Sequence, residues 1–213
     1  MLVSYSKHMS NMSSSTKKNL PGYFAISIKS AGSRYLISTN NERAFIVSQL
    51  QDLLGVRSLL EDPYSYKRMA AHVDLLAFSI RKESIELLVF SIAKSSAITL
   101  ATIVHTRLQQ FQSESMLRNG ESIPNIHIAA LHGPHDALAK SVAIHLLHPD
   151  WEYDRYSSIG FYLYDRRGDW MRIWRLSNLF ENTPSLYLSL LRSSLITDRN
   201  DTEAILDART VAS

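Results

Sequence analysis

The chain has 213 residues, a formal net charge of +3, and 45% hydrophobic against 20% charged residues. These values are those of an ordinary globular domain that is long enough to bury a sizeable core. The absence of cysteine excludes disulfides and thiolate chemistry, and it fits a cytoplasmic protein. Because no apolar run of about 18 residues is present, we expect no membrane partner.

Composition divides the chain into four parts. Residues 1–18 are polar, lack an apolar segment of signal-peptide length, and indicate a disordered tail. An α+β domain is expected over residues 19–150, an aromatic-rich helical extension of the same domain over 151–196, and a polar tail over 197–213. Residues 1–41 contain lysine and arginine but no acid, which suits either a polyanionic partner or a solvated tail.

The first predicted elements are a strand and a helix. YFAISIKS (residues 23–30) alternates apolar and polar side chains, as a half-buried strand does. Thr39 and Glu42 have the spacing of a capping box, and the apolar stripe that follows predicts a helix closed by Gly55. A short edge segment, AGSRYLIS, is expected between the two.

A hairpin and further helices follow. AFSIRKESIELLVFS (residues 77–91) predicts strand, polar turn and strand, and residues 95–119 have the apolar spacing of a long helix. IPNIHIAAL predicts a short strand, Asp136 a helix N-cap, and PSLYLSLLRSSL a last helix. This order predicts an α+β, ferredoxin-like fold: an antiparallel sheet with helices on one face, plus a C-terminal helical extension.

The predicted hairpin places two polar residues on one face of an apolar strand. Ser84 and Glu86 are two residues apart, and alternate residues of a strand share a face. Such a pair is either a solvent-exposed polar surface without a function or part of a functional site.

Several segments together resemble the REP-associated tyrosine transposases and their HUH-type insertion-sequence relatives. They are PGYFAISIKSAGSRYLISTNNERAFIVSQL, LLAFSIRKESIELLVFS, ITLATIVHTRLQQFQ, VAIHLLHPD and YDRYSSIGFYLYDRRGDWM. The resemblance lies in their order and spacing, and it runs from about Pro21 to about Leu191. It implies a DNA partner, hairpin or single-stranded, and allows a monomer or a homodimer.

The positions at which this chain departs from the family pattern imply that strand-transfer chemistry is lost. Where the family has a metal-binding His-hydrophobic-His, this chain has Ser84, Ile85 and Glu86, and a serine with one carboxylate is a weak metal site. The family's catalytic tyrosine falls on Arg107, or on Leu108 one residue later. We therefore expect no catalytic residue and no cofactor, with magnesium or manganese relevant only to residual activity.

Basic residues supply the expected DNA contacts. They are Lys29, Arg34, Arg81, Lys82, Arg166 and Arg167. Arg81 and Lys82 lie in the hairpin turn beside the former metal position, where direct charge could replace a metal-mediated contact; the alternative is a solvated turn. The eight aromatic residues between Trp151 and Trp174 alternate with arginine, which suits either base stacking or, as we expect for most of them, packing.

Two alternatives to a DNA-binding protein without catalysis remain. The histidines of residues 127–148 could bind zinc, or could join Glu86 in a metal-dependent nuclease, if they converge; otherwise they are surface or structural residues. These histidines are His127, His132, His135, His145 and His148. The scaffold could also serve as a protein-interaction module without DNA binding.

Overall fold

A four-stranded antiparallel sheet forms the centre of the protein. The computed structural model describes residues 20–30, 35–55, 69–115, 124–164 and 166–195. The strands are β1 (Gly22–Ser30), β2 (Val73–Ile80), β3 (Ser84–Ser91) and β4 (Pro124–Leu131). Their order in the sheet is β2-β3-β1-β4, and every neighbouring pair is antiparallel. The predicted α+β class and the predicted hairpin are thereby confirmed. The segment 35–38 is not a strand.

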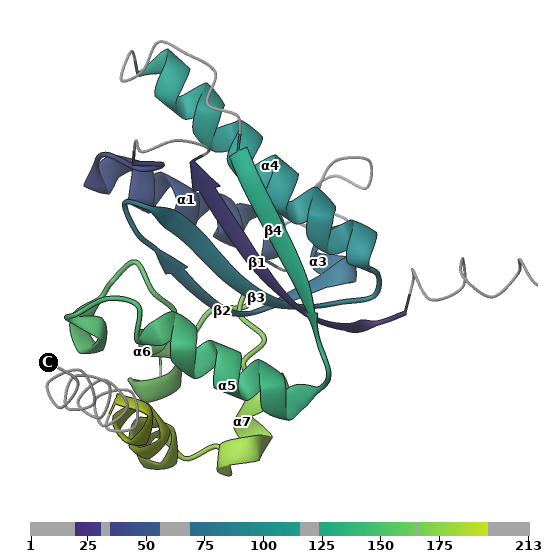
Figure 1. The fold of residues 1–213 in the computed structure, drawn as a ribbon, viewed down its shortest axis with the longest axis vertical. Helices are drawn as coiled ribbons and strands as arrows, with labels where there is room; N and C mark the ends of the chain where they lie inside the picture. Colours follow the sequence, from purple (N-terminus) through teal and green to yellow (C-terminus); the bar gives the residue numbers. More distant parts are fainter. Residues whose placement is uncertain (1–19, 31–34, 56–68, 116–123, 165, 196–213) are drawn as a thin grey trace, which may run out of the picture.

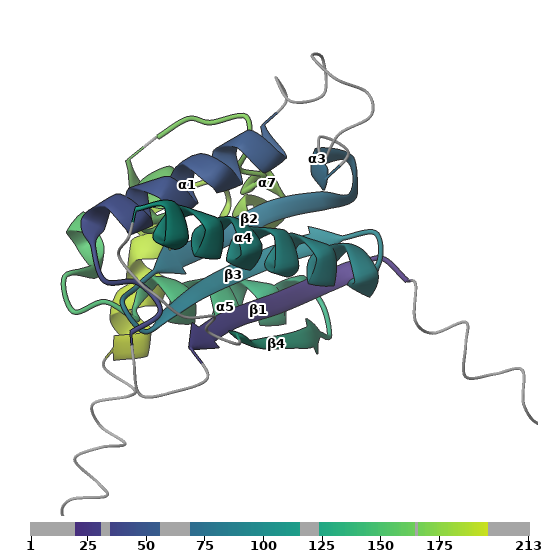
Figure 2. The same cartoon turned by 90° about the horizontal axis from the view of Figure 1, so that it is seen from above.

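Two long helices cover one face of the sheet, which we term the helical face. They are α1 (Asn40–Leu54) and α4 (Lys94–Glu114), and both lie on the same side of the strands in Figures 1 and 2. Alternate strand residues such as Ile26 and Leu87 pack there against helix residues such as Leu50 and Val104. Gly55 ends α1, but with extended backbone (φ −73°) rather than the left-handed cap that a glycine permits.

A shorter helix, α5 (Pro134–His145), crosses part of the other face. It packs over Leu76, Ala77 and Leu88. Helices were expected on one face of the sheet only, but α5 lies on the face opposite the helical face. Asp136 is not the N-cap that the sequence predicts. It lies in the first turn, where its carboxylate accepts a hydrogen bond from the backbone N–H of His132 at 3.2 Å.

The chain beyond α5 packs along the outer side of β2. Its elements are η3 (Trp151–Tyr153), α6 (Ile159–Leu163), α7 (Trp174–Ser177), η4 (Asn178–Phe180) and a helix over residues 184–195, while α3 (Met69–His72) precedes β2. Trp151, Phe161, Tyr162 and Trp170 join the core of the sheet. Of the eight aromatics in residues 151–174, these four are buried and Tyr156 is partly buried, whereas Tyr153, Tyr164 and Trp174 are exposed. Among the described helices, none has the length and hydropathy needed to cross a bilayer.

The predicted capping box is present, and its glutamate does more than cap. Glu42 is fully buried, and its Oε2 accepts hydrogen bonds from Ser38 N–H (2.8 Å), Thr39 N–H (2.6 Å) and the Thr39 hydroxyl (2.9 Å). Its Oε1 accepts one from Gln112 of α4 at 2.5 Å. Burial alone would raise the pKa of Glu42, but the hydrogen bonds from Gln112, Ser38 and Thr39 together lower it. Glu42 therefore joins the entry of α1 to α4 as a carboxylate.

A buried histidine joins α5 to the C-terminal helix. Ser158 Oγ accepts from Phe78 N–H at 2.8 Å, and His145 Nε2 is hydrogen-bonded to Ser158 Oγ at 2.6 Å. His145 Nδ1 is hydrogen-bonded to the Tyr187 hydroxyl at 2.7 Å, and this hydroxyl lies 3.0 Å from that of Ser141. Burial lowers the pKa of His145 to about 3, so the ring is neutral.

Candidate functional site

The polar pair on β3 lies in a row that crosses three strands. Ser84 and Glu86 do share a face, the one opposite the helical face, and Glu86 is only 7% exposed. Glu86 lies opposite Ser27 of β1 on one side and Ser79 of β2 on the other. The Ser27 hydroxyl donates to Glu86 Oε1 at 2.8 Å, and the buried Ser79 hydroxyl has no hydrogen-bond partner in the described part of the chain.

This row is not a metal centre within the described residues. No group of three His, Asp or Glu side chains there lies close enough to hold an ion. The histidines do not converge: His145 is in the core, whereas His127 is exposed on β4 and His135 is exposed at the start of α5. The zinc hypothesis and the nuclease hypothesis both need a convergence that these residues do not show.

The structure does not bring together the two positions where the family would have its catalytic groups. Arg107 lies between the two helices of the helical face, where its guanidinium donates to Gln49 and pairs with Asp52 of α1 at 3.3 Å. Ser84 and Glu86 point to the opposite face of the sheet. A nucleophile at position 107 would therefore be separated from them by the sheet itself.

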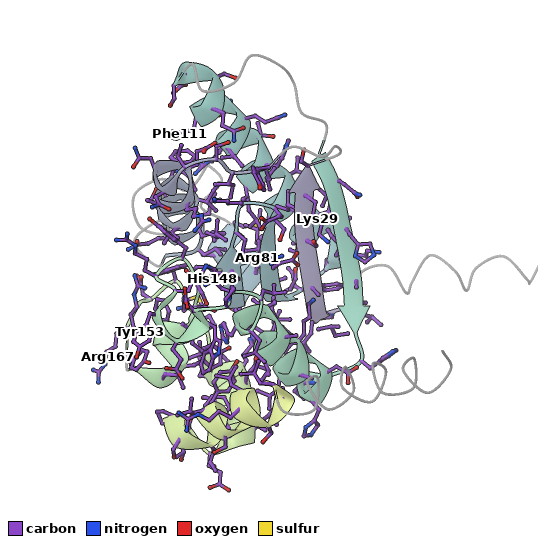
Figure 3. All side chains as sticks on the ribbon, turned by 60° about the vertical axis from the view of Figure 1, so that its left-hand side comes forward. Lys29, Arg81, Phe111, His148, Tyr153 and Arg167 are labelled. Carbon is purple, nitrogen blue, oxygen red and sulfur yellow. The ribbon has the colours of Figure 1, made fainter. Side chains whose placement is uncertain are left out.

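Arg81 is turned inward rather than toward solvent. Its guanidinium donates to the carbonyl of Leu147 (3.3 Å) and to the Ser84 hydroxyl (3.2 Å), while its buried Nε has no partner among the described residues. Figure 3 shows Arg81 near His148, just beyond α5. Arg81 thus joins the β2–β3 turn to the end of α5. It is a positioning residue for this turn, and its contact with a phosphate stays a prediction.

Lys82 is the exposed cation of the turn. Its ammonium lies 5.8 Å from the centre of the Tyr35 ring, and its backbone carbonyl accepts from Ile37 N–H at 3.0 Å. Tyr35 itself is 54% exposed. Lys29 lies opposite Ser84 at the same end of the sheet. This end of the sheet therefore carries two exposed lysines, Lys82 in the turn and Lys29 on β1, and Lys82 lies beside an accessible tyrosine ring.

A second tyrosine beside the turn lies between two arginines. The Tyr156 carbonyl accepts from Ile80 N–H at 3.0 Å, which places this residue at the end of β2. The guanidinium of Arg43, on α1, lies 5.5 Å from the ring centre of Tyr156, and that of Arg155 lies 5.3 Å from it. Contacts between distant segments thus gather a cationic and aromatic surface.

We refer to this surface as the basic hairpin end. It consists of Lys29, Tyr35, Arg43, Lys82, Arg155 and Tyr156. None of its four cations forms an ion pair with another described residue, whereas Arg175 is paired with Asp74 at 2.6 Å. Its acidic neighbours are Glu83 in the turn and Asp154, whose carboxylate accepts from Tyr156 N–H at 2.9 Å.

Sequence reasoning found part of this surface. Lys29 and Lys82 were predicted contacts, but Tyr35 and Arg43 were not, because no local pattern indicates which segments meet at the turn. The interleaving of aromatic and basic residues that includes Arg155 was the available signal.

The remaining predicted contacts lie elsewhere or outside the described residues. Arg166 is exposed, with its guanidinium 5.1 Å from the Phe161 ring centre. Arg167 is also exposed, and Figure 3 shows it and Lys29 on opposite sides of the molecule. Arg34 lies outside the described residues. The predicted basic residues therefore do not form one continuous patch.

Comparisons with protein-family models, with curated protein sequences and with solved structures find no match to this chain. Functional inference therefore rests on the geometry of the basic hairpin end and of the buried polar row.

Proposed function

We propose that this protein binds single-stranded or hairpin DNA through the basic hairpin end, as a transposase-like DNA-binding protein without strand-transfer chemistry. The observation that carries the proposal is the pairing of two tyrosine rings with cations at one end of the sheet: Lys82 over Tyr35, and Arg43 with Arg155 over Tyr156.

Both components of such a surface have a physical role in nucleic-acid binding. Cations that have no protein counter-ion neutralise phosphates and release condensed counterions, which favours binding at low salt. Exposed aromatic rings stack on unpaired bases at about 1–3 kcal/mol per base. Tyr35 is the more exposed of the two rings, so we assign it the stacking contact and assign Lys82 a neighbouring phosphate.

The loss of chemistry is supported by the buried polar row. Glu86 is hydrogen-bonded to Ser27 and lies on the face of the sheet opposite Arg107, so a phosphate at the basic hairpin end would meet no metal ligand set among the described residues. Binding should therefore need neither magnesium nor manganese. A cysteine-free chain with a DNA partner fits the cytoplasm.

Charge reversal at the basic hairpin end tests the proposal. The double variant Lys82→Glu/Arg155→Glu is expected to weaken binding to a labelled single strand at least about tenfold at low salt, because two phosphate contacts become repulsive. Lys94→Glu is the matched control, since Lys94 is exposed and begins α4 at the opposite end of β3 from the turn. Fluorescence anisotropy titration measures both.

Substitutions of Tyr35 test the stacking contact separately from the phosphate contacts. Tyr35→Leu should weaken single-strand binding about 5- to 150-fold, the loss of one stacked base, while Tyr35→Phe should bind like the natural chain. Equal binding by the double reversal and Lys94→Glu would rule the basic hairpin end out as the DNA surface.

A further inference from the structure

One edge strand of the sheet, β2, is covered by another segment of the chain, whereas the other edge strand, β4, is open among the described residues. The outer edge of β2 is covered by the C-terminal segment, through Ser158 N–H to Phe78 C=O (2.9 Å), Arg172 N–H to Leu75 C=O (2.8 Å) and a bridge between Ser79 and Ser157. The outer edge of β4 receives no backbone hydrogen bond from any described segment. Figure 2 shows β4 at the margin of the sheet, with β1 as its neighbour.

The open edge also lacks the features that normally prevent strand addition. β4 is eight residues long and pairs with β1 without a bulge from Leu131 to Pro124. Its sequence, PNIHIAAL, has no lysine, arginine or acid, and its proline is at the first position. Natural proteins protect exposed edges with charges, internal prolines, bulges or short strands. A regular, uncharged edge of this length can accept another strand.

We infer that β4 pairs with β4 of a second copy of this chain, in antiparallel orientation about a two-fold axis, to form one continuous eight-stranded sheet. A strand pairing with itself in this way is self-complementary, because the two-fold places each copy's backbone donors opposite the other's acceptors. Since β4 carries no lysine, arginine or acid, the pairing brings no such charges of like sign together. The axis also keeps each face of one sheet continuous with the same face of the other.

The helical face supplies an apolar flank to this edge. In an α-helix, residues nine apart lie on opposite sides, because each residue advances by about 100°. Arg107 faces α1, so Ile98, nine residues earlier, faces away from α1 on a helix that also contacts β4. Ile98 is 45% exposed, and Ile126 and Ile128 are only partly buried against the core. Strand pairing would remove more of this apolar surface from water.

The pairing makes a geometric prediction that the cysteine-free chain can test cleanly. Because each face must continue across the junction, one residue of β4 lies opposite its own copy, with a Cα separation of about 4.5–5.5 Å. That separation is within the range of a disulfide. A single cysteine in this chain can only form an intermolecular disulfide, since no other cysteine is present.

The test combines molar mass with a cysteine scan of residues 125–130. Light scattering of the natural chain should give about twice the mass of the 24.2 kDa protomer. One scanned variant, under mild oxidation, should form the disulfide dimer at least about tenfold faster than Ser189→Cys, an exposed control position on the helix over 184–195. A monomeric mass at high micromolar concentration, or a dimer with no scanned position above the control, would overturn the proposal.

Discussion

Acidification from pH 7 to pH 5 is expected to lower the free energy of unfolding by about 2 kcal/mol through His145 alone. The pKa of His145 is about 3 in the folded protein against an ordinary value of 6.5. Between these values the unfolded chain binds a proton that the folded chain does not, so stability falls as the pH drops below 6.5. The physical cause is burial, because a protonated ring would be a charge in the core.

The variant His145→Gln isolates this effect. It should be less stable than the natural chain at pH 7, because the bonds to Ser158 and Tyr187 are broken or distorted, but its stability should fall by about 2 kcal/mol less between pH 7 and pH 5. Urea unfolding at several pH values in this range measures the difference. His135→Gln is the control, since this histidine is exposed. Parallel pH profiles for the natural chain and His145→Gln would refute the assignment.

Replacement of Glu42 with glutamine is expected to destabilise the protein by about 3–4 kcal/mol at pH 7. Glutamine has one acceptor oxygen, whereas the carboxylate of Glu42 accepts from Ser38, Thr39 and Gln112 through both oxygens. At least one buried donor would then lack a partner or face the new amide. Glu114→Gln, on the exposed last turn of α4, should change stability by no more than about 0.5 kcal/mol.

Glu42 and His145 can be distinguished by the pH range in which each acts. The pKa of Glu42 is lowered from an ordinary value of 4.5, so its stabilisation is fully present above pH 4.5 and is lost only as the pH falls toward the lowered value. Between pH 7 and pH 5, Glu42→Gln should therefore keep the same slope as the natural chain and differ by a constant. A change of slope in that range would contradict the assignment of that slope to His145.

Local patterns predicted most of the elements and little of their assembly. The spacing of Thr39 and Glu42 indicated the start of α1, and alternation indicated β1 and the β2–β3 hairpin, because these signals arise within a few residues. Which face of the sheet a helix covers is set by tertiary packing. For that reason α5 on the second face was not foreseen, nor was the separation of Arg107 from Glu86 by the sheet.

The residues of the candidate site also could be predicted only in part, because local patterns do not indicate tertiary contacts. Lys82 was predicted from its turn, but Arg43 and Tyr156 are more than one hundred positions apart in the sequence and meet only because the chain after α5 returns to the end of β2. Arg81 was predicted as a phosphate contact from its place in the turn, and its hydrogen bonds to the carbonyl of Leu147 and the hydroxyl of Ser84 were not predicted. Neither the contact between Arg43 and Tyr156 nor the hydrogen bonds of Arg81 can be predicted from the local sequence pattern.

The central claim, DNA binding at the basic hairpin end without metal, is tested most directly by titrating the natural chain against a labelled DNA hairpin and an unstructured single strand. The titration is run over a salt series, with and without magnesium. We expect binding at low salt that weakens with a log–log slope of about −3 on the single strand, as four phosphate contacts require, and that magnesium does not strengthen. Absence of binding at low salt, or binding that does not depend on salt, would contradict the claim and favour a scaffold that binds another protein.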